Sequence, residues 1–261
     1  MGKITSALKK AADDRLHRIE KISKIKEQDQ VIVQKMGSSK IDPRVITYFD
    51  PKALITEQYK ILRTNFFSIN KGRPPKTIVI TSALHSEGKT ITTLNLSVAM
   101  AQTIKRPKIL LIDADMRRGL VAKYLGVEQS LGLSEVLSGQ ATLAQRLFNI
   151  DLENLTFLSS GAVPNNPTEL LSSQSMKDLM DEVKNKFDFI FIDTPPIIAV
   201  TDSGILGALV DGVIMVIQAG RTQRGVIKRA SELLNQSHAH LIGHVLTNIE
   251  YHLPEYIYRY L

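Results

Sequence analysis

Gly88, Lys89 and Thr90 are the residues of this sequence best suited to chemistry, and they follow a short apolar run, TIVIT. A strand that leads through a glycine-containing turn into a helix is the layout of a phosphate-binding loop. Backbone N–H groups and the helix N-terminus then surround the β-phosphate, Lys89 bridges the β- and γ-phosphate oxygens, and the Thr90 hydroxyl ligates Mg²⁺. The pattern G-x-x-x-x-G-K-[ST] has Ala83 in place of its first glycine. The sequence therefore predicts a nucleotide site at residues 83–90; the alternative is a strand-to-helix turn that contains GKT by chance.

Carboxylates follow two further apolar runs. KILLID ends at Asp113 and is followed by Asp115 and Arg117, and FDFIFID ends at Asp193. The carboxyl ends of parallel strands meet at one edge of a sheet, which is where ligands bind. Carboxylates at this edge hold Mg²⁺ directly or through water, and one that reaches the substrate accepts its proton. We expect Asp113 and Asp193 to position magnesium. Either Asp113 or Asp115 is the proton acceptor, and the residues leave that choice open.

The elements that must position these residues alternate along the chain. Apolar runs predict strands at 77–81, 108–113, 155–159, 187–193, 213–218 and 241–249. Helical patterns predict helices at 53–69, 90–103 and 223–237, a short helix at 132–139, and a helix start at the end of the Pro/Asn loop 161–171. Strands that alternate with helices are typical of a doubly wound, mostly parallel sheet flanked by helices. We therefore expect an α/β fold of the P-loop NTPase kind.

Length and composition limit the possible classes. With 261 residues, 43% of them hydrophobic, the chain is long enough for one large α/β core. The lack of cysteine excludes disulfide bonds and thiolate metal sites. The apolar runs are far shorter than the roughly 20 residues of a membrane span, and the charged N-terminus lacks a signal-peptide core, so we expect a cytoplasmic protein. The net charge of +7 suits nucleic acid, anionic lipid or an acidic partner without choosing among them.

The chain divides into three regions. Residues 1–52 form an N-terminal extension: helical spacing of apolar residues among lysines and arginines predicts a basic amphipathic helix at 1–28. That helix either contacts anionic lipid or a partner, or is a solvated extension. Glycine and prolines at 29–52 are typical of a linker. We assign the P-loop domain to 53–250 and a tyrosine-rich tail to 251–261.

Four of the seven tyrosines lie in the last 11 positions: Tyr251, Tyr256, Tyr258 and Tyr260. A terminal segment that follows Pro254 is expected to be mobile. Measured from Asn248, the extended tail would reach at most about 45 Å, which is far enough to enter the site of a neighbouring subunit. The alternating spacing of the last three tyrosines also fits an edge strand, which is the alternative interpretation.

Together these motifs resemble those of the bacterial tyrosine kinase family, the autokinases of capsule and exopolysaccharide synthesis, which group with the Min/Par-type P-loop ATPases. The resemblance covers residues 53–261. The loop 83–90 corresponds to Walker A, IDADMR at 112–117 to Walker A′, and IFIDTPP at 190–196 to Walker B. The segment GAVPNNPTELL at 161–171 is similar to the family's Pro-Asn-Pro-x-Glu-Leu-Leu motif.

The resemblance implies an ATP- and Mg²⁺-dependent protein-tyrosine autokinase whose targets are the four tail tyrosines. It assigns catalysis to Lys89, Asp113, Asp115, Arg117 and Asp193, and magnesium binding to Thr90, Asp113 and Asp193. It assigns nucleotide binding to Ala83, Leu84, His85, Ser86, Glu87, Gly88, Lys89, Thr90 and Asn248. Many members carry Pro-Gly where this chain has His85-Ser86, so the loop is expected to differ in shape.

The resemblance also implies partners. Glu57, Lys60 and Arg63 resemble the family's Glu-x-x-Arg-x-x-Arg helix, through which subunits assemble into rings. Lys60 keeps the charge of arginine but loses bidentate pairing, which predicts a weaker ring. Family members act beside a transmembrane polysaccharide chain-length regulator, so we expect a separate activator, a location at the inner face of the cell membrane through it, and a cognate tyrosine phosphatase. No nucleic acid partner is expected.

Two other classes compete with the kinase. A Min/Par-type partitioning ATPase would carry an additional lysine early in the P-loop, where this chain has Leu84, and would lack the tyrosine tail. A non-catalytic ATP-binding scaffold would not need Lys89, Asp113 and Asp193, all of which are present. These residues favour the kinase.

Overall fold

The computed structural model describes residues 41–69, 76–127, 131–149 and 152–249. All of them belong to one compact unit, Met36–Leu261. The amphipathic helix predicted at 1–28 and the tyrosine tail at 251–261 lie outside the described residues. Within the described residues, no helix has the length and apolarity that a membrane crossing requires.

The core of the fold is one seven-stranded sheet. Its strands are β1 (Thr77–Ser82), β2 (Ile109–Asp113), β3 (Leu147–Asn149), β4 (Leu155–Leu158), β5 (Phe189–Asp193), β6 (Gly212–Gln218) and β7 (Leu241–Thr247). They lie in the order β3-β4-β2-β5-β1-β6-β7, and all neighbours are parallel except β3 and β4. Asp113 pairs with Asp193 in register, so two of the predicted site carboxylates end adjacent strands at the same level. The predicted doubly wound sheet is confirmed.

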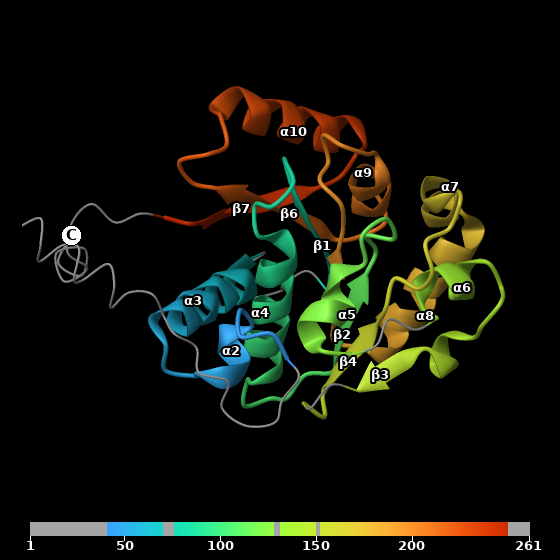
Figure 1. Cartoon of the computed structure of the whole chain (residues 1–261), viewed down its shortest axis with the longest axis horizontal. Helices are drawn as coiled ribbons and strands as arrows, with labels where there is room; N and C mark the ends of the chain where they lie inside the picture. Colours follow the sequence, from blue (N-terminus) through green and yellow to red (C-terminus); the bar gives the residue numbers. More distant parts are fainter. Residues whose placement is uncertain (1–40, 70–75, 128–130, 150–151, 250–261) are drawn as a thin grey trace, which may run out of the picture. The chain divides into compact units, whose positions relative to one another are not determined.

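Helices connect these strands and cover both faces of the sheet. They are α2 (Ile46–Phe49), α3 (Leu54–Ser68), α4 (Lys89–Ala101), α5 (Leu120–Leu125), α6 (Leu133–Leu137), α7 (Pro167–Ser172), α8 (Gln174–Lys186), α9 (Asp202–Gly207) and α10 (Arg224–Gln236). A 3₁₀ turn spans Leu143–Gln145. Figure 1 shows α3 and α4 on one side of the sheet and α6, α7 and α8 on the other.

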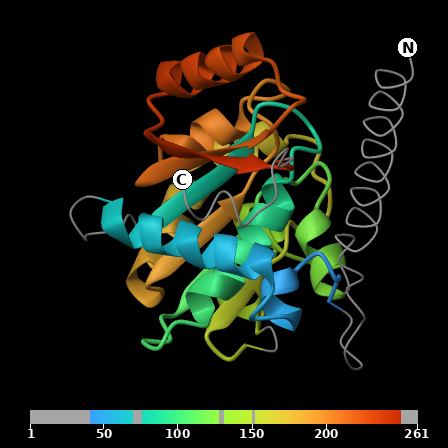
Figure 2. The same ribbon diagram turned by 90° about the vertical axis from the view of Figure 1, so that its left-hand side faces the viewer.

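The sheet separates two hydrophobic cores because successive side chains of a strand point to opposite faces. Val79 of β1 packs in the core that α6 to α10 cover, whereas Ile78 and Ile80 pack in the core that α2 to α5 cover. Figure 2 shows α3 as the outer helix on its side, in front of α4. α4 is therefore enclosed between the sheet and α3, and all but one of its residues are buried. This burial fixes the helix that begins at the predicted phosphate loop.

Part of the segment expected to be a linker packs against the core. Ile41 and Val45 are buried, and the Thr47 hydroxyl and N–H both donate to Asn95 Oδ1 of α4, at 2.9 and 3.0 Å. Glycine and proline content suggested an extended connection here, but these buried side chains and a satisfied buried amide hold the chain on α4. Residues 41–49 thus extend the packed unit beyond the N-terminal boundary that the sequence suggests.

Candidate active site

The predicted phosphate loop joins β1 to α4 and has an unusual backbone. Gly88 has φ +92° and Ser86 has φ +63°, both in the left-handed region. A Cβ at Gly88 would also lie 3.3 Å from Thr247 Cγ2, so a side chain there is doubly disfavoured. Ser86 adopts its φ of +63° at a cost of about 1 kcal/mol, which a glycine at this position would not incur. α4 begins at Lys89, and its first N–H groups are free to bind phosphate.

Glu87 fixes the shape of this loop from inside. Its side chain is buried and accepts hydrogen bonds from the Leu84 N–H at 2.6 Å, the Gln218 N–H at 3.4 Å and the Thr222 hydroxyl. The Thr247 hydroxyl donates to the Glu87 carbonyl at 2.8 Å. Glu87 therefore ties the loop to the β6–α10 connection and to the end of β7.

Two other residues of the predicted nucleotide set lie at the exposed rim. His85 accepts a hydrogen bond from the Arg118 guanidinium at its Nδ1, 3.3 Å away. Asn248 follows Thr247 directly and has φ +53°. Because the Thr247 hydroxyl bonds the phosphate loop, Asn248 is held beside that loop.

Lys89 and Thr90 meet the predicted carboxylates in a buried cluster. Lys89 Nζ lies 3.1 Å from Asp115 Oδ2 and 3.5 Å from Asp193 Oδ2, and the Thr90 hydroxyl donates to Asp193 Oδ2 at 2.7 Å. All four residues are less than a tenth exposed. Burial lowers the pKa of Lys89, but the charges of Asp193 and Asp115 outweigh it and raise that pKa above its usual value. Lys89 is therefore a cation at neutral pH.

Asp113 is bound differently, although it ends the neighbouring strand. Its Oδ1 accepts the Asp115 N–H at 3.1 Å and its Oδ2 accepts the Val121 N–H at 3.0 Å. Burial, together with the negative charge of Asp193, raises the pKa of Asp113 to about 8. Burial also raises the pKa of Asp193, against the opposing charge of Lys89. The cluster therefore disfavours the ionisation of all its carboxyls at once.

Asp115 is the carboxylate with an open acceptor. Its Oδ2 accepts from Lys89, while its buried Oδ1 has no hydrogen-bond partner among the described residues. A buried carboxylate oxygen without a donor is costly, and a substrate hydroxyl or a metal-bound water would satisfy it. Since both oxygens of Asp113 already accept backbone N–H groups, the geometry favours Asp115 as the proton acceptor, a choice that the sequence left open.

The residues present also fit magnesium. No cluster of three or more acidic, histidine or cysteine side chains that could hold a metal by itself occurs in the described part of the chain. Mg²⁺ in nucleotide sites needs no such cluster, because phosphate oxygens and water supply most of its ligands. The Thr90 hydroxyl oxygen lies 2.7 Å from Asp193 Oδ2, and the unpartnered Oδ1 of Asp115 lies in the same cluster. The donor set of hydroxyl and carboxylate oxygens is what this hard cation prefers.

Arg117 belongs to a second network, which sequence reasoning missed. Its Nε lies 3.3 Å from Asp202 Oδ2 and its Nη2 donates to the Thr168 hydroxyl at 3.0 Å. The Thr168 hydroxyl in turn donates to Asp202 Oδ1 at 2.7 Å. Asp202 is fully buried at the start of α9, and Thr168 lies in α7. Two helices thus hold the guanidinium in place at the loop that carries Asp115.

This network predicts that Asp202 positions Arg117. Replacing Asp202 by asparagine removes the charge that orients the guanidinium, and we expect kcat to fall about tenfold with little change in KM. The measurement is steady-state phosphate transfer in a double-mutant cycle with Arg117→Gln. Because both substitutions act through the Arg117 guanidinium, Asp202→Asn should cause almost no further loss of kcat in the Arg117→Gln background. Independent, additive losses would contradict this role.

Glu135 anchors the loop that leads to α7. Its carboxylate accepts the N–H groups of Gly132 at 2.6 Å and Ala162 at 3.1 Å. Gly161 has φ +80°, and a Cβ there would lie 2.2 Å from Glu135 Oε2, so the loop approaches the carboxylate as closely as glycine permits. Burial acts to raise the pKa of Glu135, but these N–H donors outweigh it and hold the pKa below its ordinary value of 4.5.

This lowered pKa gives a pH-dependent prediction. Glu135→Gln should lower the free energy of unfolding by about 2 kcal/mol at pH 7, because a charged acceptor is lost. A depressed folded-state pKa contributes stability above the unfolded value of 4.5 that is lost as pH falls through the lower folded-state value. The difference between the two proteins should therefore shrink below about pH 4.5 in urea titrations. A difference that does not depend on pH would rule out this account.

Comparisons with known proteins agree with the fold. Residues 75–240 match the AAA domain family. Tyrosine-protein kinase YwqD of Bacillus subtilis (strain 168) is 39% identical over 214 residues, which cover 82% of this chain and 90% of YwqD. The class is thus that of P-loop nucleotide-binding proteins with an AAA domain.

Solved structures show which proteins of this class have a closely similar fold. The kinase domain of Escherichia coli tyrosine kinase ETK superposes with a TM-score of 0.77 at 26% identity, over 87% of this chain and 90% of that domain. The chimerical protein CapA2B2 has a TM-score of 0.75 at 30% identity, over 86% of this chain and 98% of the chimera. The chain belongs to the bacterial tyrosine-protein kinase family. This membership confirms the resemblance.

Proposed function

We propose that this chain is an ATP-dependent protein-tyrosine autokinase that phosphorylates its tail tyrosines and thereby regulates capsule or exopolysaccharide synthesis and export. The tyrosines are Tyr251, Tyr256, Tyr258 and Tyr260. The observation that carries the proposal is the buried cluster in which Lys89 lies 3.1 Å from Asp115 and Thr90 lies 2.7 Å from Asp193. The kinase domain is residues 53–250, with residues 41–49 packed on it.

ATP binds with its phosphates in the loop 83–90. The Lys89 ammonium exchanges its contact with Asp115 for the β- and γ-phosphate oxygens, because the polyphosphate carries more charge than one carboxylate. Thr90, together with phosphate oxygens, would hold magnesium, and Asp113 and Asp193 would position its waters; the ion would neutralise charge on the phosphates. The exchange frees Asp115 to act on the substrate.

In the transfer step, the tyrosine oxygen attacks the γ-phosphorus and the bond from that phosphorus to the β–γ bridging oxygen breaks, which releases ADP. A tyrosine hydroxyl has a pKa near 10 and is protonated at neutral pH, so it needs an acceptor for its proton. Asp115 is that acceptor. Lys89 and Arg117 offset negative charge on the transferring group.

The substrate tail reaches the site of another subunit in a ring. The described chain reaches Ile249 just after β7, and the tail begins two residues further along the sequence, at Tyr251. Lys60 pairs with Glu57 at 2.7 Å on α3, and Arg63 donates to the Ala99 carbonyl of α4 at 2.7 Å. Three apolar side chains of α3 are about half exposed: Leu54, Ile55 and Ile61. An exposed apolar face beside the charged triad supports α3 as the ring contact.

The remaining partners follow from the family. We propose a separate transmembrane polysaccharide chain-length regulator as activator, whose cytoplasmic end completes the site and holds the kinase at the inner face of the membrane. A cognate tyrosine phosphatase would reverse the reaction.

A mixing experiment tests transfer between subunits. The donor chain carries all four tail tyrosines as phenylalanine, and the acceptor chain carries Lys89→Met with its tyrosines intact. We expect phosphotyrosine on the acceptor only when donor, acceptor and Mg-ATP are combined. An acceptor that also carries the four Tyr→Phe changes is the control and should stay unmodified. Transfer in trans would be contradicted if the acceptor in the mixture gained no phosphotyrosine while the chain without substitutions phosphorylated itself.

A further inference from the structure

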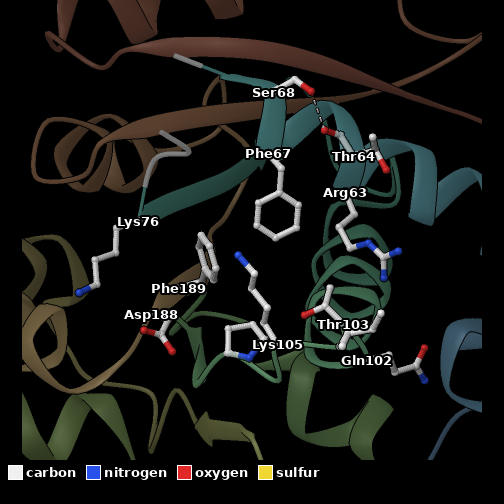
Figure 3. Close-up of a pocket in the computed structure, with 12 residues that line it drawn as sticks. Arg63, Thr64, Phe67, Ser68, Lys76, Gln102, Thr103, Lys105, Asp188 and Phe189 are labelled. Atoms are coloured by element: carbon white, nitrogen blue, oxygen red, sulfur yellow. Dashed lines mark hydrogen bonds between the residues drawn. The ribbon is translucent and has the colours of Figure 1, made fainter. Parts of the chain in front are cut away.

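A cavity lies at the edge of the sheet opposite the phosphate loop. The loop is at the carboxyl ends of the strands, whereas this cavity is lined where β1, β2 and β5 begin, by Lys76, Pro107 and Asp188. The ends of α3 and α4 complete it (Figure 3). Its volume is about 1080 Å³, which is large enough for a phospholipid headgroup and part of an acyl chain. None of the proposed catalytic residues lines it.

The lining combines apolar surface with positive charge. Phe67 and Phe189 stack edge-on with their centroids 5.7 Å apart, and Figure 3 shows Lys105 directed into the same space. Three cations line the cavity against one carboxylate: Arg63, Lys76 and Lys105 against Asp188. The Asp188 carboxylate already accepts the Lys108 N–H at 2.8 Å. In the described part of the chain Lys105 makes neither a hydrogen bond nor an ion pair, so its charge is available to an anion.

The α4–β2 loop adds an apolar tip at the mouth of this cavity. Ile104 is completely exposed, at 103% of its reference area, more than any other large apolar side chain in the described residues. Lys105 and Arg106 follow it, and Arg106 has φ +42° and closes a turn by donating its N–H to the Thr103 carbonyl at 2.9 Å. Arg106 also lies 4.0 Å from Glu153, but both side chains are more than three-quarters exposed and pair weakly.

We infer that this edge of the kinase docks on an anionic phospholipid bilayer. Ile104 enters the interfacial layer, and Lys105 and Arg106 contact lipid phosphates around it. The cavity behind them takes one headgroup beside Lys105, next to the Phe67 ring. A polyanion such as nucleic acid would satisfy the cations but not the exposed isoleucine. A bilayer satisfies both, because its apolar interior lies directly beneath a layer of phosphates.

This contact goes beyond the proposed function, because it requires neither the activator nor the predicted N-terminal helix. It also leaves the catalytic edge free. The phosphate loop and the end of β7 lie at the other ends of the strands, so a kinase seated on Ile104 keeps its nucleotide site and the start of its tail away from the lipid.

The charge contribution is tested by sedimentation of the full-length chain with vesicles of equal parts phosphatidylcholine and phosphatidylglycerol. Each cation near such a surface contributes about a fivefold factor in binding, so Lys105→Gln/Arg106→Gln should lower the partition coefficient about 30-fold. The matched control is Lys228→Gln/Arg229→Gln, an exposed basic pair on α10, which should change it little. Equal losses in both variants, or none in either, would overturn the inference.

The apolar contribution is tested separately with Ile104→Ser, whose matched control is Val163→Ser, another exposed side chain. Only Ile104→Ser should weaken vesicle binding. Pure phosphatidylcholine vesicles should bind far less than the mixed ones; equal binding to both would count against anionic lipid. Melting curves of all variants show that they fold, as surface changes of this kind seldom cost more than about 0.5 kcal/mol. If Lys105→Gln/Arg106→Gln loses duplex DNA binding and keeps vesicle binding, the partner is nucleic acid and the inference fails.

Discussion

We expect the replacement of Lys89 by methionine to lower phosphate transfer to the tail tyrosines about 10³-fold, because no other cation in the described cluster lies within reach of Asp115 and Asp193. ATP affinity should fall as well, since we propose that the lysine bridges phosphate oxygens in the bound state. Transfer is measured as phosphotyrosine formed per minute, and affinity by calorimetry with Mg-ATP.

This change also leaves two buried carboxylates without their counter-charge, so folding must be checked by thermal denaturation. Lys228→Met is the matched control, because it removes an exposed lysine on α10 and should keep full transfer. Transfer by a folded Lys89→Met chain at more than about a tenth of the normal rate would remove Lys89 from the mechanism.

Replacing Asp115 by asparagine separates binding from chemistry. We expect kcat to fall about 10³-fold, because the acceptor of the tyrosine proton is lost. ATP should bind more tightly, since Lys89 is released from its 3.1 Å contact and one negative charge near the phosphates disappears. The measurement is kcat from single-turnover transfer together with the Kd for Mg-ATP.

Asp113→Asn is the comparison variant. Asp113 accepts two backbone N–H groups, and an asparagine can accept only one of them without a clash between donors. This variant should therefore lose stability and metal binding rather than the proton acceptor. If Asp113→Asn abolishes transfer at saturating Mg-ATP while Asp115→Asn transfers normally, the two roles are exchanged.

The fold was largely predictable because its strands are buried on both faces. β2 and β5 are apolar runs that end in Asp113 and Asp193, and β1 is buried along its whole length, so the topology alone brings the two aspartates together. The short antiparallel β3 carries only three partly exposed residues and no such signal. α9, six residues with two glycines, likewise lacks a helical pattern.

α8 was missed although a signal was present. Its buried residues recur at helical spacing: Met176, Leu179, Met180 and Val183. Ser173 accepts the Met176 N–H at 3.3 Å as an N-cap. Both features can be recognised in the sequence. However, only Ser173 separates α8 from the short helix α7, and this obscures the boundary between the two helices.

The parts of the site that sequence could not predict depend on loop packing. Asp202 and Thr168 meet Arg117 although 34 residues separate them from each other, and no periodic pattern relates these positions. Glu87 contacts Thr222 across 135 residues, and its buried carboxylate reads in sequence as an ordinary loop residue. The positive φ of Ser86 could be suspected from the missing glycine but not established.

The central claim, that this chain is an autokinase acting on its own tail, is tested most directly by intact-mass spectrometry. The full-length chain is incubated with Mg-ATP, alone and with peptides from the cytoplasmic end of candidate activators, beside the Lys89→Met chain. We predict added phosphates that map to Tyr251, Tyr256, Tyr258 and Tyr260 and are absent from the variant. Hydrolysis of ATP with no phosphate on the tail would support a partitioning-type ATPase instead, and failure to bind ATP would leave a non-catalytic scaffold.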